Sequence, residues 1–247
     1  MIKFFRKIRY DLMEKNKTGK YFKYAIGEIV LVVVGILIAL SINNWNENRI
    51  KSNNETAILA NIHKEFMQNK IQLERIVKMH KREHTSCAKI ISLFPITSKP
   101  ESVVLDSLSR YLLNSYGGYT FDPSQTSINA LTNTSSFDII SNEDLRNLLI
   151  SWSDLVKDYQ EDERYNKDFI MNLYQVYISK HFGWNFNFND ERNDFKALQS
   201  LEFEYLVQNK YDLVNWILYE NFELKKVQEA LDKIIELSDP INYKDIN

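Results

Sequence analysis

The chain has 247 residues and a formal net charge of −2, with only 6 glycines and 4 prolines. This shortage of turn-forming residues disfavours β-rich and linker-rich folds, and a single cysteine excludes an internal disulfide framework. The first 23 residues carry eight bases and two acids, a net charge of +6, so the remaining chain carries −8. A domain with this negative charge repels the phosphates of nucleic acid, so we expect no nucleic-acid partner.

Residues 1–23 form a basic leader in which apolar side chains alternate with lysines and arginines. This alternation predicts an amphipathic helix that lies on the anionic inner face of a membrane. The alternative is that the bases only set the orientation of the segment that follows.

Residues 24–42 predict a transmembrane helix, because Glu28 is their only charged residue. They would span roughly 28 Å as a helix, close to the thickness of a bilayer core. Basic residues stay on the cytoplasmic side, so we expect a bacterial inner-membrane protein with a cytoplasmic N-terminus and residues 43–247 in the periplasm. A cleaved signal peptide is the alternative, since Ala39-Leu40-Ser41 is an acceptable cleavage site. The long leader and Glu28 favour a retained anchor.

Small residues within this segment predict that the membrane helix packs against another helix. Gly27, Gly35 and Ala39 lie close to one helical face, and Gly35-x-x-x-Ala39 permits close approach. Glu28 is then a polar contact or a titrating group, although a glutamate that reaches the interface on an isolated helix is the simpler alternative.

The stretches MIKFFRKIR and YAIGEIVLVVVGILIALSINNWNENR resemble the opening of a family of uncharacterised single-pass proteins from Bacteroidetes-type bacteria, domain of unknown function 6090. The stretch TSINALTNTSSFDIISNEDLRNLLISW is similar to the middle of that family, although Ser135-Ser136 stands where the family often has Ser-Gly. The resemblance implies an anchored helical protein and supplies no catalytic residues.

The chain beyond the membrane predicts further helices, so the expected fold is all-α: one transmembrane helix followed by an elongated helical bundle. Apolar residues at three-four spacing continue the first helix to about Leu93, with Asn69 and Glu83 inside the stripe. Caps and breakers then place helices at about 102–114, 123–133, 141–180 and 194–237, the last as one helix or two.

His80, His84 and Cys87 share one helical face and are a weak candidate for a metal site. Packing is the favoured interpretation, because His80 and Cys87 fall on the apolar stripe. We therefore expect no metal and no cofactor.

Trp184, Phe186 and Phe188 alternate with asparagines and are candidates for contact with a partner or ligand, unless they fold back onto the bundle. The acidic run 161–163 is expected on a solvated helix face.

The sequence contains no Gly-rich phosphate loop, Gly-x-Ser-x-Gly or Cys-x-x-Cys motif, so we do not expect an enzyme. The favoured function is a non-enzymatic interaction or scaffold subunit whose partners are the lipid bilayer and another membrane protein or a second copy. The alternative is a ligand-sensing module that acts through a separate signalling partner, because 23 cytoplasmic residues hold no output domain.

Overall fold

A computed structural model gives the fold and describes residue 10 and residues 18–188 and 190–240. All elements in these ranges are helices, with no strand among them. The predicted all-α class is therefore confirmed. Most of the predicted amphipathic leader, residues 1–9 and 11–17, lies outside the described residues.

The first described helix, α2 (Thr18–Ile91), has 74 residues and contains the whole predicted membrane segment. Its end at Ile91 lies close to the predicted end near Leu93. The chain divides into two units, Met1–Glu55 and Thr56–Asn247, so α2 contributes its first part to one unit and the rest to the other.

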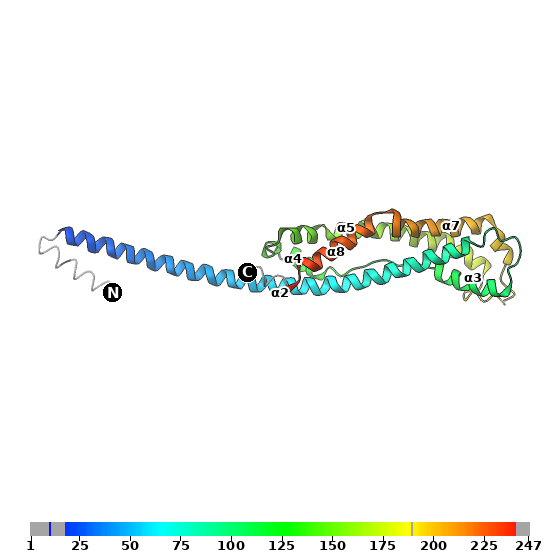
Figure 1. The fold of residues 1–247 in the computed structure, drawn as a ribbon, viewed down its shortest axis with the longest axis horizontal. Coiled ribbons are helices and arrows are strands. Elements are labelled where there is room, and N and C mark those ends of the chain that lie inside the picture. The colour runs from blue at the N-terminus through cyan, green and yellow to red at the C-terminus, as the bar shows by residue number, and fades with distance from the viewer. Residues whose placement is uncertain (1–9, 11–17, 189, 241–247) are drawn as a thin grey trace. The chain divides into compact units, whose positions relative to one another are not determined.

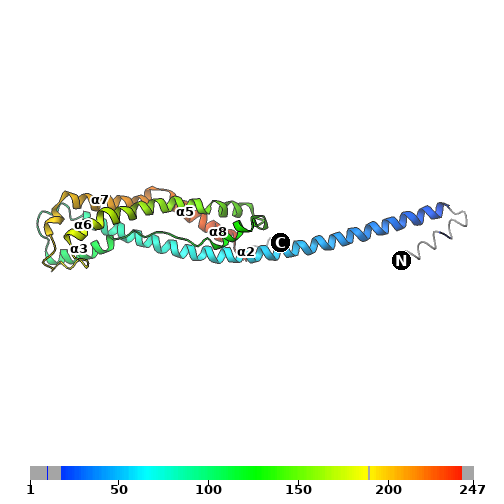
Figure 2. The same cartoon turned by 180° about the vertical axis from the view of Figure 1, so that it is seen from behind.

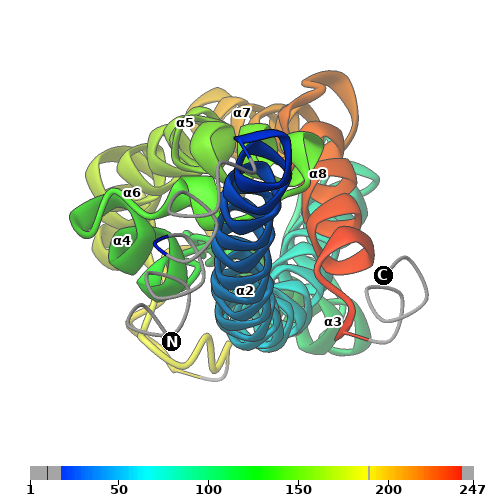
Figure 3. The same cartoon turned by 90° about the vertical axis from the view of Figure 1, so that its left-hand side faces the viewer.

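The second unit is a helical bundle, which confirms the prediction that helices follow the apolar segment (Figure 1). Besides the end of α2 it contains α3 (Ser102–Ser115), α4 (Thr126–Asn133), η1 (Phe137–Ile139), α5 (Glu143–Phe169), η2 (Ile170–Tyr174), α6 (Gln175–His181), η3 (Phe195–Gln199), α7 (Leu201–Asn215), η4 (Trp216–Glu220) and α8 (Glu223–Leu237). Within the bundle, α3 and α6 lie at one end (Figure 2) and α4 lies at the other (Figure 1). Figure 3 shows the helices nearly end-on.

Two of the predicted long helices contain π-helical turns. The helix predicted to end near Lys180 runs from Glu143 to His181 as α5, η2 and α6. The stretch from Asp194, predicted as one helix or two, contains η3, α7, η4 and α8. It breaks after η4 because Asn221 has an extended backbone, and the side-chain amide of Asn221 donates a hydrogen bond to Asp162 on α5.

Side chains on α2 also fix the connection between α3 and α5. Glu65 accepts hydrogen bonds from the backbone amides of Thr126 (2.6 Å) and Ser127 (2.8 Å), so a carboxylate on α2 caps the start of α4. The Asn69 side chain pairs with both the amide and the carbonyl of Ser124, at 2.9 Å each. The polar position that interrupts the apolar stripe of α2 therefore holds the segment before α4 in place.

The bundle is built around two apolar cores. The first joins α2 to α4, α5 and α8 and includes Leu59, Phe66, Trp152, Val227 and Leu231. The second joins the end of α2 to α3, α6 and α7 and includes Ile90, Leu108, Tyr174, Leu198 and Phe203.

Candidate functional site

Apolar side chains cover the first part of α2 on every side. Between Ile29 and Ile42 the large aliphatic side chains are all exposed, and no part of the most apolar window is buried inside the protein. Leaving these side chains in water would cost on the order of 20 kcal/mol. Among the described residues α2 is the one helix long and apolar enough to cross a membrane, judged by length and composition alone.

Three residues of the predicted packing face share one side of this helix. At about 3.6 residues per turn, Glu28, Gly35 and Ala39 fall within roughly 40° of one another, and Gly27 lies roughly 80° from Gly35. A Cβ added at Gly27 or Gly35 would meet nothing within 4 Å. Open space therefore lies over both glycines in the single chain, as close approach of a second helix requires.

The bundle contains a cluster of charged side chains that no solvent reaches. His80 and Glu83 come from α2, Glu163 and Asn166 from α5, and Lys210 from α7, and each is fully buried. On all three helices these residues lie between those that build the first core and those that build the second. We call this group the ionic cluster.

Short contacts link the members of the ionic cluster. The Nε2 atom of His80 donates to Glu163 Oε1 at 3.0 Å. Lys210 Nζ donates to Glu83 Oε2 at 2.7 Å and to Asn166 Oδ1 at 2.8 Å. His80 Nδ1 lies 3.8 Å from Glu83 Oε2, which is an ion-pair distance and too long for a hydrogen bond.

The loop between α3 and α4 closes the cluster. The Phe121 amide donates to Glu163 Oε2 at 2.6 Å, so both oxygens of that carboxylate have donors. Gly117 packs directly on the Glu83 carboxylate, and a Cβ at Gly117 would overlap the carboxylate atoms. Only glycine fits at this position while the ionic cluster keeps its geometry.

Electrostatics favour the charged forms of His80 and Glu83. Burial lowers the pKa of His80, but the hydrogen bond to Glu163 and the nearby Glu83 charge outweigh this and raise it above the ordinary 6.5. Burial raises the pKa of Glu83, but His80 and Lys210 outweigh this and lower it below 4.5. With His80 protonated, two carboxylates face one imidazolium and one ammonium, so the buried charges balance.

The three residues of the weak metal candidate have separate surroundings. His80 belongs to the ionic cluster, whereas His84 bonds Asn215 at 3.1 Å and stacks on Tyr211 with ring centroids 4.3 Å apart. Burial raises the pKa of the Cys87 thiol to about 12, so it is not a thiolate near neutral pH. In the part of the chain that the structure describes, no three His, Cys, Asp or Glu side chains are arranged to hold a metal ion.

The aromatic loop after α6 presents one aromatic side chain rather than three. Trp184 is 84% exposed, but Phe186 and Phe188 are buried at 3% and 9% exposure. Both phenylalanines pack against Phe182 in the second core, so these two follow the alternative in which the aromatics fold back onto the bundle. Asn193 holds the loop by bonding the amide of Gly183 and the carbonyl of Asn187.

The prediction that the acidic run is solvated is wrong for one of its three residues. Glu163 faces inward to His80, whereas Glu161 is exposed and Asp162 half-buried. The helical spacing of both glutamates from apolar residues indicated that they face the core. Glu163 lies four residues after the buried Tyr159, and Glu83 lies seven residues before the buried Ile90. A polar residue on such a stripe indicates a buried partner but does not identify it.

An open pocket of about 510 Å³ lies between α2 and α4. It is lined by Ile58, Asn61, Thr126, Ser127, Ala130, Leu131, Thr134, Ser136 and Ile139, so its walls are aliphatic and hydroxyl-bearing without a charged side chain.

Fold and site together define an all-α protein with one N-terminal helix apolar enough to span a membrane and a bundle joined by a buried ionic cluster. The model of a family of unknown function, DUF6090, matches residues 28–187. That range is more than half of the chain, so the protein belongs to this family, as the resemblance of its first 50 residues implied. No curated protein and no solved structure matches the chain. The matched range ends in the Trp184 loop, before α7 and α8.

Proposed function

We propose that the protein is a membrane-anchored, non-enzymatic interaction subunit that associates through its membrane helix. In this proposal residues 24–42 cross the inner membrane of a bacterium, with the basic leader in the cytoplasm and the bundle in the periplasm. The excess of bases before the segment supports this orientation. The partner is another membrane protein or a second copy of the chain.

The observation that carries this proposal is the composition of one face of α2. Glu28, Gly35 and Ala39 lie together on an otherwise aliphatic helix, with open space above Gly35. A second helix can approach a small-residue face closely, and a carboxylate near the membrane edge can then bond across the interface. The ionic cluster is sealed inside the bundle, which supports a structural role for it.

Two substitutions test this proposal, each of which introduces a larger side chain on one of two opposite faces of α2. Gly35→Leu fills the proposed interface, whereas Val30→Phe adds bulk roughly 160° away from Glu28. Crosslinking of the full-length protein in native membranes should lose its adducts with Gly35→Leu and keep them with Val30→Phe. Equal crosslinking of both variants and the wild type would mean that this face is not the contact.

A ligand-sensing module that acts through a separate signalling partner is the second candidate, and the pocket between α2 and α4 favours it. Its lining suits a small, mostly apolar molecule, although no charged group converges on it to fix an orientation. Ala130→Phe would fill the pocket and should abolish binding of an apolar fluorescent dye. Unchanged dye binding would remove the support that the pocket gives.

A further inference from the structure

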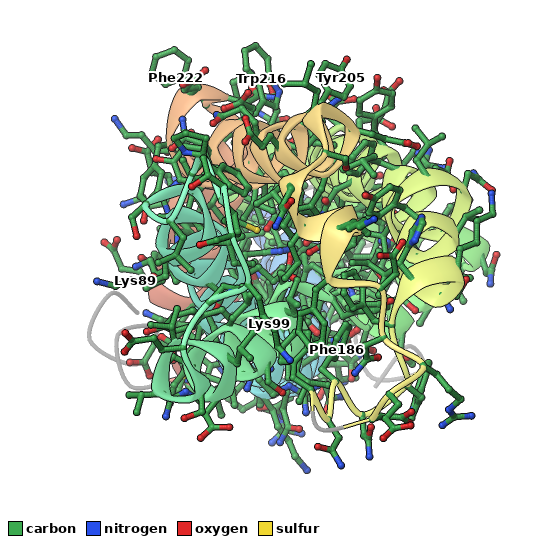
Figure 4. The ribbon with its side chains drawn as sticks, turned by 90° about the vertical axis from the view of Figure 1, so that its right-hand side faces the viewer. Lys89, Lys99, Phe186, Tyr205, Trp216 and Phe222 are labelled. Atoms are coloured by element: carbon green, nitrogen blue, oxygen red, sulfur yellow. The ribbon has the colours of Figure 1, made fainter. Side chains whose placement is uncertain are left out.

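Four large aromatic side chains are exposed on the segment that runs from α7 through η4 to the start of α8. Tyr205 is 68% exposed, Trp216 47%, Tyr219 58% and Phe222 69%. Tyr205, Trp216 and Phe222 project from the same edge of the bundle, away from its interior (Figure 4). We call these four residues the aromatic face. Scattered exposed aromatics are ordinary on a protein surface, whereas several that project to the same side of one segment are typical of an interaction site.

Two of these side chains are held in position before any partner binds. Trp216 Nε1 donates a hydrogen bond to Asp162 on α5 at 3.3 Å. The ring of Tyr219 packs edge-on against His84 of α2, with centroids 5.4 Å apart. Aromatic groups fixed in this way lose little conformational freedom on binding, which is a property of residues that dominate interface energetics.

Along the segment from Leu201 to Phe222, the charges that face solvent have a single sign. Every acid between Leu201 and Phe222 is exposed or half-buried, whereas the single base of that segment, Lys210, is sealed in the ionic cluster. The acids are Glu202, Glu204, Asp212 and Glu220. The Asn215 side chain donates to Glu220 Oε1 at 2.6 Å, which fixes the carboxylate of a residue that follows Tyr219 directly in the sequence.

Lysines at the start of α8 do not reverse this charge. Lys226 pairs with Glu223 at 2.7 Å, and Lys225 lies 3.6 Å from Glu229. Each is thus matched by a carboxylate on its own helix. Along the stretch from α7 to the start of α8, the exposed charges without a lysine partner on the same helix are therefore the acids of α7 and η4.

We propose that the aromatic face binds a basic segment of a partner protein, one that carries arginine or lysine side chains. A guanidinium or ammonium group can lie over an aromatic ring while it pairs with an adjacent carboxylate, so both features select the same cation. The acids repel anionic lipid and nucleic acid, and they repel the same face of a second copy. The proposal rests on the proposed function as an interaction subunit and adds a contact separate from the membrane helix.

Binding of short peptides to the purified full-length protein in detergent tests the charge preference directly. The probe is an arginine-serine peptide, with a glutamate-serine peptide of equal length as its charge control. We expect the arginine peptide to bind at physiological ionic strength and the glutamate peptide not to bind. Absence of binding by the arginine peptide, or equal binding of both, would overturn the proposal.

Variants distinguish specific binding at the aromatic face from nonspecific electrostatic binding of a basic peptide to an acidic protein. Trp216→Ala combined with Phe222→Ala should weaken binding of the arginine peptide by about ten-fold or more, because aromatic anchors dominate such contacts. Asp212→Asn with Glu220→Gln should also weaken it. Trp184→Ala is the matched control, since Trp184 is 84% exposed but lies on another loop, and it should bind as the wild type does. Wild-type binding by the aromatic double variant, or an equal loss with Trp184→Ala, would overturn the proposal.

A photocrosslinking residue placed at Phe222 in cells identifies the natural occupant. We expect adducts with one recurrent protein segment that has an excess of arginine and lysine. Adducts with lipid, with glycan, with an acidic segment or with a second copy of this chain would contradict the proposal. Gly35→Leu should leave binding of the arginine peptide unchanged, so failure of the membrane contact and failure of the aromatic face are distinguishable.

Discussion

The ionic cluster determines how the stability of the bundle depends on pH. A buried charge is tolerated only when its partner is present, and here His80, Glu83, Glu163 and Lys210 compensate one another across three helices. The directions of the two pKa shifts define the pH range in which that compensation is complete.

We predict that the bundle is most stable at mildly acidic pH. The pKa of His80 is raised above 6.5, so its contribution is fully present below 6.5 and is lost as pH rises through the folded value. The pKa of Glu83 is lowered below 4.5, so its contribution is present above 4.5 and is lost as pH falls through the folded value. Urea unfolding should show a higher midpoint at about pH 5.5 than at about pH 8.5.

The variant His80→Gln is the control for this pH dependence. It removes the titrating group but keeps a side chain that can donate to Glu163, so the difference between the two pH values should shrink. An equally large difference in His80→Gln would show that another group is responsible.

We also predict a large effect from a single methyl group at Gly117. Gly117→Ala must displace the Glu83 carboxylate from Lys210, which should lower the free energy of unfolding by about 3 kcal/mol. The matched control is Gly183→Ala, where the added Cβ meets only ordinary contacts at 3.7 Å or more. Thermal or urea unfolding of both variants gives the comparison, and equal stability of the two would contradict the described packing.

The start of α5 shows how accurately a local sequence pattern predicts a helix boundary and its capping residue. The sequence 141–144 predicts a capping box and therefore a helix start. The helix does begin there, but Asn142 is the cap: its side chain accepts from the Leu145 amide at 2.9 Å. Several cap-forming residues in a row predict the boundary well, whereas the choice among them depends on the path of the preceding chain.

Asn142→Ala should therefore destabilise the bundle by about 1 kcal/mol, because one amide of the first turn loses its partner. Asn142→Asp keeps an acceptor oxygen and adds a favourable charge at a helix start, so it should stay near the wild type. Urea titrations of the two variants measure the difference. Equal loss in both would show that Asn142 acts by something other than capping.

For the membrane part of α2, we predict that Glu28→Gln weakens association by roughly 1 kcal/mol, about five-fold, because a charge-assisted bond becomes a neutral one. The population of crosslinked species across a dilution series in lipid measures this. Unchanged association would leave Gly35 and Ala39 as the determinants and remove the role assigned to Glu28.

For the protein as a whole, apolar spacing predicted most of the fold but not the interior polar contacts. The three-four pattern along α2 and the loop breakers predicted the helices because each is a local property. Neither the pairing of His80 with Glu163 nor that of Glu83 with Lys210 has a local signal, since the partners are 83 and 127 residues apart. The inward turn of Phe186 likewise depends on the second core, which assembles from distant segments.

The two units treat their apolar side chains differently. The bundle buries its own apolar side chains in two cores, whereas the aliphatic side chains of residues 24–42 are exposed in the single chain and, in the proposed function, are covered by a bilayer. The family match spans both units, so a chain of this family combines a membrane-competent helix with a folded bundle.

The most direct test of an anchored interaction subunit is a crosslinked pull-down of the full-length protein from native membranes, with its topology determined on the same tagged molecule. Mass spectrometry should identify one recurrent membrane protein or further copies of this chain, and the bundle should be accessible only from the periplasmic side. Recovery of the chain alone with no crosslinked species larger than a single copy, or of a bundle released from the membrane without residues 24–42, would contradict the account.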